Sequence, residues 1–222
     1  MTVHLHRDLD RLRREILAMG ALVEEATDKA ISALVRRLPD LAQEVIDHDA
    51  IVDQKEVEVE EECLKLLALH QPVAVDLRFI ITCLKVNNDL ERVGDLAVNM
   101  AERAAYLARH APLPFPGDLE EMAQKVRAMV RDSLDALVRH DARLAEKVLA
   151  GDDEVDDANR RLFRVFQERM FKEPSEAKRA IAAISSSRYL ERIADHATNI
   201  AEDVIFMIEG KIIRHRAERF EE

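Results

Sequence analysis

The chain has little of what many protein classes require. It contains no tryptophan, and aromatic residues make up only 4% of its 222 residues. So few aromatic side chains argue against a β-sandwich, whereas abundant alanine, leucine, valine, glutamate and arginine are typical of long helices. The two cysteines are too few for a disulfide scaffold or a thiolate metal centre. We therefore expect buried free thiols at Cys63 and Cys83.

Long apolar runs are also missing. No segment approaches the ~20 apolar residues that a membrane-spanning helix needs, and residues 1–14 carry too many charges for a signal peptide. The 44 acidic against 33 basic residues give a net charge of -11, which repels a nucleic-acid backbone. Glycine-rich phosphate loops and nucleophile elbows do not occur. The sequence thus predicts a cytoplasmic protein without membrane insertion, nucleic-acid binding or nucleotide-dependent catalysis.

Prolines and glycines are few, and nearly all of them stand where a helical pattern begins or ends. They divide the chain into six expected helices, at residues 3–38, 40–70, 73–109, 119–140, 142–170 and 175–209. Helices of about 30 residues are stable in water only when they pack side by side. We therefore expect an all-α protein of two tandem, repeated three-helix bundles of antiparallel helices, residues 1–111 and 112–222, joined at the proline-rich segment 112–117.

One polar segment occurs twice in the chain. Residues 90–102 read LERVGDLAVNMAE, and residues 190–202 read LERIADHATNIAE. A repeat that served only to fill a core would retain apolar positions and let the acids vary, so the retained acids indicate a function. Gly94 becomes Ala194, which indicates a shared need for a small side chain. His196 replaces Leu96, and we interpret this as a local surface substitution.

Each half also carries two carboxylate pairs at a spacing of four residues, one on its second and one on its third expected helix. Side chains at i and i+4 lie on one helix face, so each pair can direct two carboxylates at a common point. If the two helices are antiparallel neighbours, four carboxylates converge and need a cation, protons or basic side chains. Hard oxygen ligands suit magnesium, calcium, manganese or ferric iron. The candidate metal ligands are Asp49, Asp53, Glu91, Asp95, Asp152, Asp156, Glu191 and Asp195, with Asn99, Glu102, Asn199 and Glu202 as additional candidates.

Other interpretations of these acids stay open. Surface acids at this spacing are common, and either solvation or pairing with Arg78, Arg92 and Arg192 would explain them. Three functions are therefore compatible with the sequence: a docking adaptor, a metalloenzyme with oxygen ligands, and a structural helical scaffold. No histidine has a glutamate three positions before it, which disfavours a di-iron carboxylate enzyme.

The segments AVDLR at 74–78, DLERVGDLAVN at 89–99 and YLERIADHATN at 189–199 resemble the PhoU family of phosphate-signalling regulators, and the resemblance spans essentially the whole chain. It implies two three-helix bundles without catalytic activity, and a homodimer. It also implies a cytoplasmic adaptor between the ATPase subunit of a phosphate ABC transporter and a sensor histidine kinase, which limits phosphate uptake and represses the starvation response.

The same resemblance implies iron, zinc or magnesium at the carboxylate motifs. One site would comprise Asp49, Asp53, Glu91 and Asp95, and the other Asp152, Asp156, Glu191 and Asp195. The second half departs from the pattern, because it has AKR at 177–179 and no counterpart of the DLR at 76–78. We therefore expect its site to be weaker or differently oriented.

Overall fold

The computed structural model of the protein describes residues 3–211, and all regular structure within them is helical. Within that range, no helix is both long enough and apolar enough to cross a bilayer. The elements are α1 (Val3–Arg36), α2 (Pro39–Asp47), α3 (Asp49–His70), α4 (Ala74–Ala108), α5 (Gly117–Arg139), α6 (Ala142–Leu149), α7 (Asp152–Lys172), the 3-10 turn η1 (Pro174–Glu176) and α8 (Ala177–Glu209).

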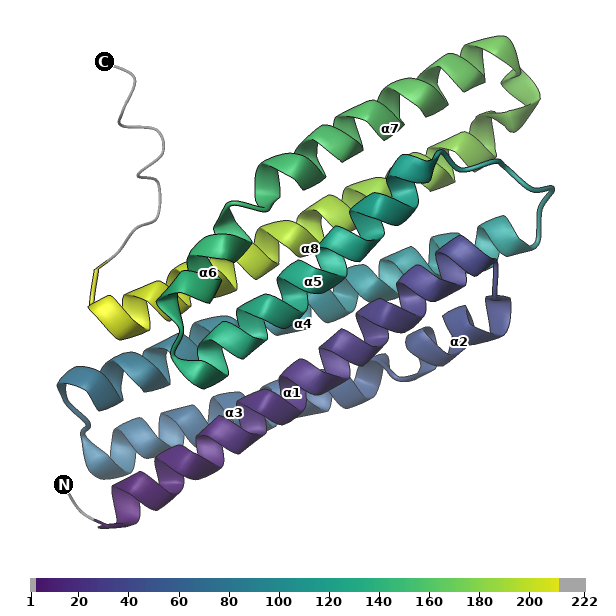
Figure 1. Cartoon of the computed structure of the whole chain (residues 1–222). Helices are drawn as coiled ribbons and strands as arrows, with labels where there is room; N and C mark the ends of the chain where they lie inside the picture. The colour runs from purple at the N-terminus through teal and green to yellow at the C-terminus, as the bar shows by residue number, and fades with distance from the viewer. Residues whose placement is uncertain (1–2, 212–222) are drawn as a thin grey trace, which may run out of the picture.

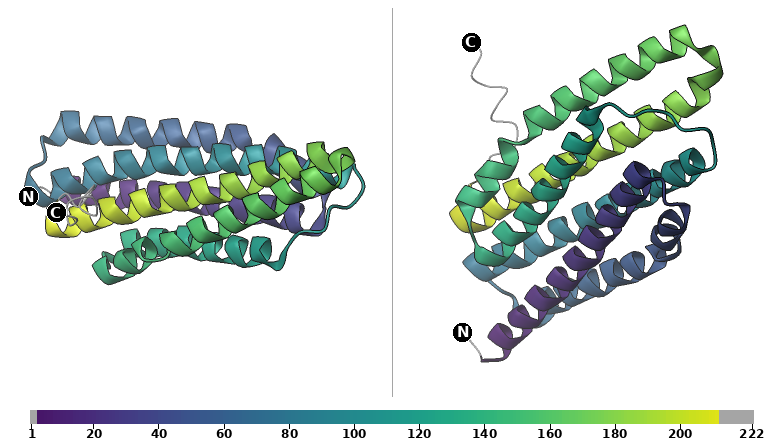
Figure 2. Two further views of the ribbon diagram at one scale, coloured as in Figure 1. Left: turned by 90° about the horizontal axis from the view of Figure 1, so that it is seen from above. Right: turned by 45° about the vertical axis from the view of Figure 1, so that its right-hand side comes forward.

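The long helices α4 and α8 lie antiparallel and form the most extensive contact of the molecule (Figure 1). Helix α3 flanks α4 on one side, and α7 flanks α8 on the other. Helices α1 and α5 pack against α4 and α8 respectively and also contact each other (Figure 2). The expected all-α fold of two repeated three-helix units is confirmed.

The two units share a single hydrophobic core. Buried apolar residues from α1 to α8 form one continuous cluster, because α4 and α8 press their apolar faces together. The linker after α4 adds to this core through Leu113, and the Phe115 ring packs edge-on against Phe166 at 6.0 Å. The expected division into residues 1–111 and 112–222 therefore stays a prediction about where one sequence repeat ends and the next begins.

Both cysteines are free and fully buried, as expected. Burial raises the pKa of Cys63 to about 12 and that of Cys83 well above its usual value. A thiol that stays protonated at neutral pH is a poor nucleophile and a poor metal ligand. The two cysteines therefore serve as small apolar core residues.

Four of the six expected helices match α1, α4, α5 and α8 to within two residues at each end. The expected continuous helices over 40–70 and 142–170 are wrong, because each breaks at one point. At the first break, the N–H of His48 is shared between Glu44 O at 3.1 Å and Val45 O at 3.3 Å. At the second, the Gly151 N–H donates to Val148 O at 3.0 Å. Bonds to the residue three positions back tighten the backbone and end a regular α-helix.

The α1–α5 contact depends on a glycine. A Cβ atom on Gly20 would lie 2.9 Å and 3.2 Å from the two Cδ atoms of Leu134, whereas one on Gly117 would meet nothing within 4 Å. We expect Gly20→Val to lower the free energy of unfolding by about 1–2 kcal/mol through overpacking. Urea denaturation measures this loss, and Gly117→Val is the matched control. Equal stability of the two variants would contradict the close packing of α1 on α5.

Candidate functional site

Two groups of carboxylates occupy equivalent places in the two halves. Asp49 and Asp152 begin α3 and α7 directly after the two helix breaks, where the positive end of the helix dipole stabilises a carboxylate. The second aspartate of each pair follows one turn later on the same face. The remaining members come from the helices that pack against α3 and α7. These members are Glu91 and Asp95 on α4, and Glu191 and Asp195 on α8.

In the first group, the carboxylates repel one another across the α3–α4 contact. Burial, followed by Asp53 and Asp95, raises the pKa of Asp49. Burial and then Asp95 raise the pKa of Glu91, and Arg92 acts in the opposite direction. The Arg92 guanidinium lies 3.3 Å from Glu91 Oε2 and 3.3 Å from Asp95 Oδ2. Part of the negative charge is therefore compensated by arginine, which is one of the interpretations that the sequence left open.

In the second group, one carboxyl has a strongly raised pKa. Burial, then Asp156 and Asp195, raises the pKa of Asp152 to about 6. Burial, then Asp195 and Asp156, also raises the pKa of Glu191. Arg160 offers limited compensation, since its Nη1 atom lies 3.7 Å from Asp156 Oδ2. Arg188 also favours the charged form of Glu191, and His196 and Arg192 favour that of Asp195, but the pKa values of both carboxyls stay raised.

The buried side-chain oxygen of Asp152 supports a cation in the second group. The Oδ1 atom is buried and has no hydrogen-bond partner among the described residues, which is costly unless a cation or a proton satisfies the oxygen. An all-oxygen donor set suits magnesium or ferric iron, and zinc also accepts carboxylates. Within residues 3–211, however, no three acidic, imidazole or thiol side chains converge closely enough to hold one ion. The donors fit a metal in kind, and their side chains would have to rotate to gather around it.

Three of the additional candidates contact groups other than the candidate carboxylates. Asn99 donates through Nδ2 to the backbone oxygen of Asp95 at 2.8 Å, and Glu102 lies 3.3 Å from Arg103. Asn199 donates to Asp89 instead, with Nδ2 3.3 Å from Oδ1. Arg78, named above as a partner for the acids, donates to the backbone oxygen of Met207 at 3.3 Å. Asn99 therefore bonds to its own helix backbone, Asn199 and Arg78 join the two halves, and Glu102 pairs with its neighbour in sequence.

A supporting contact in the second group was not anticipated. Ser187 donates through Oγ to Asn159 Oδ1 at 2.9 Å, and Asn159 hydrogen-bonds Glu191. This chain links α7 to α8 beside the carboxylates. In the first half, Asn87 donates to the backbone oxygen of Glu56 at 2.8 Å and links α3 to α4 at the equivalent place. Polar residues occur at matching positions of the two repeats, and this pattern could have identified the links, although the residue types differ.

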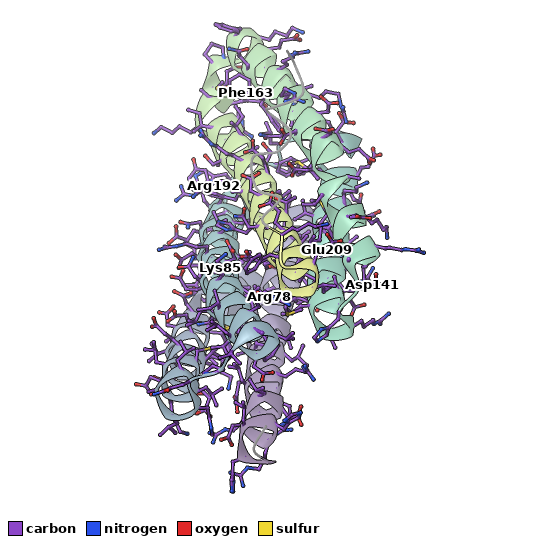
Figure 3. The ribbon with its side chains drawn as sticks, turned by 90° about the vertical axis from the view of Figure 1, so that its left-hand side faces the viewer. Arg78, Lys85, Asp141, Phe163, Arg192 and Glu209 are labelled. Carbon is purple, nitrogen blue, oxygen red and sulfur yellow. The ribbon has the colours of Figure 1, made fainter. Side chains whose placement is uncertain are left out.

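The α4–α8 contact contains a polar seam, which we define as Lys85, Asp89, His196, Asn199 and Asp203. His196 Nδ1 lies 2.8 Å from Asp89 Oδ1, and Lys85 Nζ lies 3.0 Å from Asp203 Oδ1. Figure 3 shows this part of α4, with Arg78 and Lys85, beside the end of α8 at Glu209. The interpretation of His196 as a local surface substitution is wrong, because its side chain is only 18% exposed and joins the two halves.

Comparison with known proteins matches each half of the chain separately. A family model for the PhoU domain matches residues 5–104 and again residues 119–204. The chain belongs to the PhoU family. A phosphate-specific transport system accessory protein PhoU homolog from Aquifex aeolicus is 41% identical over 212 residues, which is 96% of each chain. The corresponding Pseudomonas putida homolog is 40% identical over 94% of this chain and 82% of its own.

Solved structures of PhoU proteins share the fold. The crystal structure of PhoU from Pseudomonas aeruginosa superposes with a TM-score of 0.90 at 39% identity, covering 93% of this chain and 99% of that one. The phosphate transport system regulatory protein PhoU from Streptococcus pneumoniae gives a TM-score of 0.87 at 28% identity, over 94% and 99% of the two chains. The resemblance found in the sequence is thus confirmed along nearly the whole length of this PhoU family member.

Proposed function

We propose that this protein is a non-enzymatic regulator of phosphate transport. It acts in the cytoplasm as a homodimeric adaptor between the ATPase subunit of a phosphate ABC transporter and a sensor histidine kinase. In this role it limits phosphate uptake and represses the starvation response. The observation that carries the proposal is the full-length similarity to proteins named as accessory to the phosphate-specific transport system.

The proposed function gives the two carboxylate groups a role in metal binding. Asp49, Asp53, Glu91 and Asp95 would hold one site, and the four residues of the second group would hold the other. Raised pKa values and the partnerless Oδ1 atom of Asp152 support this assignment. A bound iron, zinc or magnesium ion would supply positive charge that offsets the repulsion and fixes the α3–α4 and α7–α8 helix pairs.

Charge reversal tests the regulatory role. In cells that lack the native gene, a chain carrying Asp95→Lys and Asp195→Lys is expected to raise the expression of a phosphate-starvation reporter in rich phosphate roughly tenfold. The reason is that a reversed charge in each carboxylate group repels a basic partner surface, at a cost of several kcal/mol. Reporter assays measure the effect, and circular dichroism checks that the helical content is unchanged.

The matched control carries the same change of charge at two exposed acids outside both groups, Glu120→Lys and Glu146→Lys. It is expected to repress the reporter like the unmodified chain. Full repression by the Asp95 and Asp195 double variant would contradict a regulatory role for the two carboxylate groups.

A further inference from the structure

The second half carries a basic groove on an otherwise acidic protein. It runs between α7 and α8 and has a volume of about 900 Å³, counting the space open to solvent. Three arginines and an exposed phenylalanine distinguish it from the remaining surface, because the chain as a whole has a net charge of -11. The lining includes Arg160, Phe163, Arg164, Gln167 and Arg188, with Glu191 of the second carboxylate group as its one acidic member among the described residues.

Two of these arginines form no close ion pair, although Arg188 interacts electrostatically with Glu191. Arg160 pairs with Asp157 at 2.6 Å, but within residues 3–211 no carboxylate lies within 4.0 Å of the guanidinium groups of Arg164 or Arg188. Phe163, in the same lining, is 47% exposed, and Figure 3 shows it on the second half, away from Lys85 of the polar seam. Exposed arginine beside an exposed aromatic ring is typical of a surface that binds acidic protein segments.

The equivalent surface of the first half has the opposite charge. When Asp49 and Asp53 of α3 are aligned with their α7 counterparts, Glu60 and Glu61 take the places of Phe163 and Arg164. Within the described range, neither glutamate has a lysine or arginine nitrogen within 4.0 Å.

Aliphatic side chains accompany these acids. Leu64 takes the place of Gln167 and is 54% exposed, and Val57, one turn before Glu61, is 44% exposed. The outer face of α3 is therefore an acidic ridge with exposed aliphatic side chains.

We propose that the acidic α3 ridge of one molecule docks into the basic α7–α8 groove of a second copy of this chain. Helices α3 and α7 lie on opposite flanks of the α4–α8 pair (Figure 1), so one molecule cannot bring its own ridge to its own groove. In a dimer with a two-fold axis, the ridge of each copy docks into the groove of the other. The interface then contains two identical ridge-in-groove contacts.

The attraction has two components. Glutamates of the ridge meet Arg164, which has no ion pair within 4.0 Å to give up among the described residues, and Arg188, whose interaction with Glu191 is only electrostatic. The exposed Val57, Leu64 and Phe163 side chains lose contact with water on docking, which adds a hydrophobic contribution. This interface specifies the homodimer of the proposed function and rests on it.

Charge reversal on each side tests the interface in the full-length chain. Sedimentation equilibrium is expected to show a dimer whose dissociation constant rises roughly 30-fold in Arg164→Glu/Arg188→Glu and in Glu60→Arg/Glu61→Arg, because each variant brings like charges together. An equimolar mixture of the two variants is expected to form heterodimers with about the affinity of the unmodified chain, since the reversed surfaces complement each other again.

The controls reverse exposed charges elsewhere, with Arg14→Glu/Arg143→Glu and Glu120→Arg/Glu146→Arg, and should dimerise normally. The proposal is overturned if the interface variants dimerise like these controls, if the mixture stays monomeric, or if the unmodified chain is monomeric. Metal content and reporter repression, measured on the same variants, report on the regulatory role separately. If the unmodified chain binds no metal and does not repress the reporter, the proposed function is contradicted and the interface is not.

Discussion

Asp152→Asn is expected to lower metal affinity by roughly 100-fold or more, because even changes behind the direct ligands of a metal cost 10- to 100-fold. The same substitution should stabilise the metal-free protein at pH 8. Burial, followed by repulsion from Asp156 and Asp195, raises the pKa of Asp152 to about 6, and one of its buried oxygens has no hydrogen-bond partner among the described residues. A residue that weakens the empty protein and is needed for metal uptake is difficult to explain as part of a structural scaffold.

The pH dependence of this effect follows from the sign of the pKa shift. The pKa of Asp152 rises from 3.8 to about 6 in the folded protein, so the folded state holds its proton more tightly than the unfolded state. Stability from this group is complete below pH 3.8 and is lost as the pH rises through 6. The gain from Asp152→Asn is therefore roughly 1 kcal/mol at pH 8, allowing for partial solvent exposure, and vanishes near pH 3.8.

Thermal unfolding of the chelator-treated protein at several pH values measures the gain, and isothermal titration calorimetry measures the loss of metal affinity. The exposed neighbour Asp153, in the same first turn of α7, provides the control Asp153→Asn. A lower melting temperature of Asp152→Asn at pH 8, or unchanged metal affinity, would refute the assigned role of Asp152.

His196→Leu is expected to lower the free energy of unfolding by about 2–3 kcal/mol, because it leaves a nearly buried carboxylate without its closest hydrogen-bond donor. Asp89, whose side chain is 10% exposed, would retain only the longer 3.3 Å contact with Asn199 among the bonds described above. Leucine is the residue that the first half has at this position, Leu96, and that side chain is buried. Leucine therefore suits position 196 in size and helix propensity, so the loss of stability reports on the missing contact with Asp89.

Chemical denaturation measures the loss, and a double variant separates its cause. Asp89→Leu/His196→Leu removes both the carboxylate and its partner, so it should recover most of the stability. If the double variant is less stable than the single variant, lost packing and not the stranded charge explains the effect.

Much of the helical architecture could be predicted from the sequence. Prolines and glycines placed four helices to within two residues, because a long amphipathic pattern between two breakers has few alternatives. The break at His48 was missed, since no proline or glycine stands there and the chain is turned by hydrogen bonds to Glu44 and Val45. The break matters for the site, because it makes Asp49 the first residue of a new helix.

The seam between the halves was missed for another reason. The residues that the two repeats share include the carboxylate groups, whereas the seam, apart from Asn199, lies at positions at which the repeats differ. Asp89 corresponds to Tyr189, Lys85 to Ser185, and His196 to Leu96. Each residue of the seam interacts with one from the other half, so its role depends on a contact across about one hundred positions of sequence that helical periodicity does not encode.

The sequence by itself determined the all-α class, the duplication, the family and the identity of the acids, because composition, breakers and a retained polar motif are local properties of the chain. Only the tertiary structure decided how these acids meet. It brought the carboxylates of adjacent helices within electrostatic reach without convergence on one point, joined the two halves into one core, and placed acidic and basic surfaces on opposite flanks. Each of these outcomes depends on which helix faces pack together, and that choice is made by the burial of apolar surface over the whole molecule.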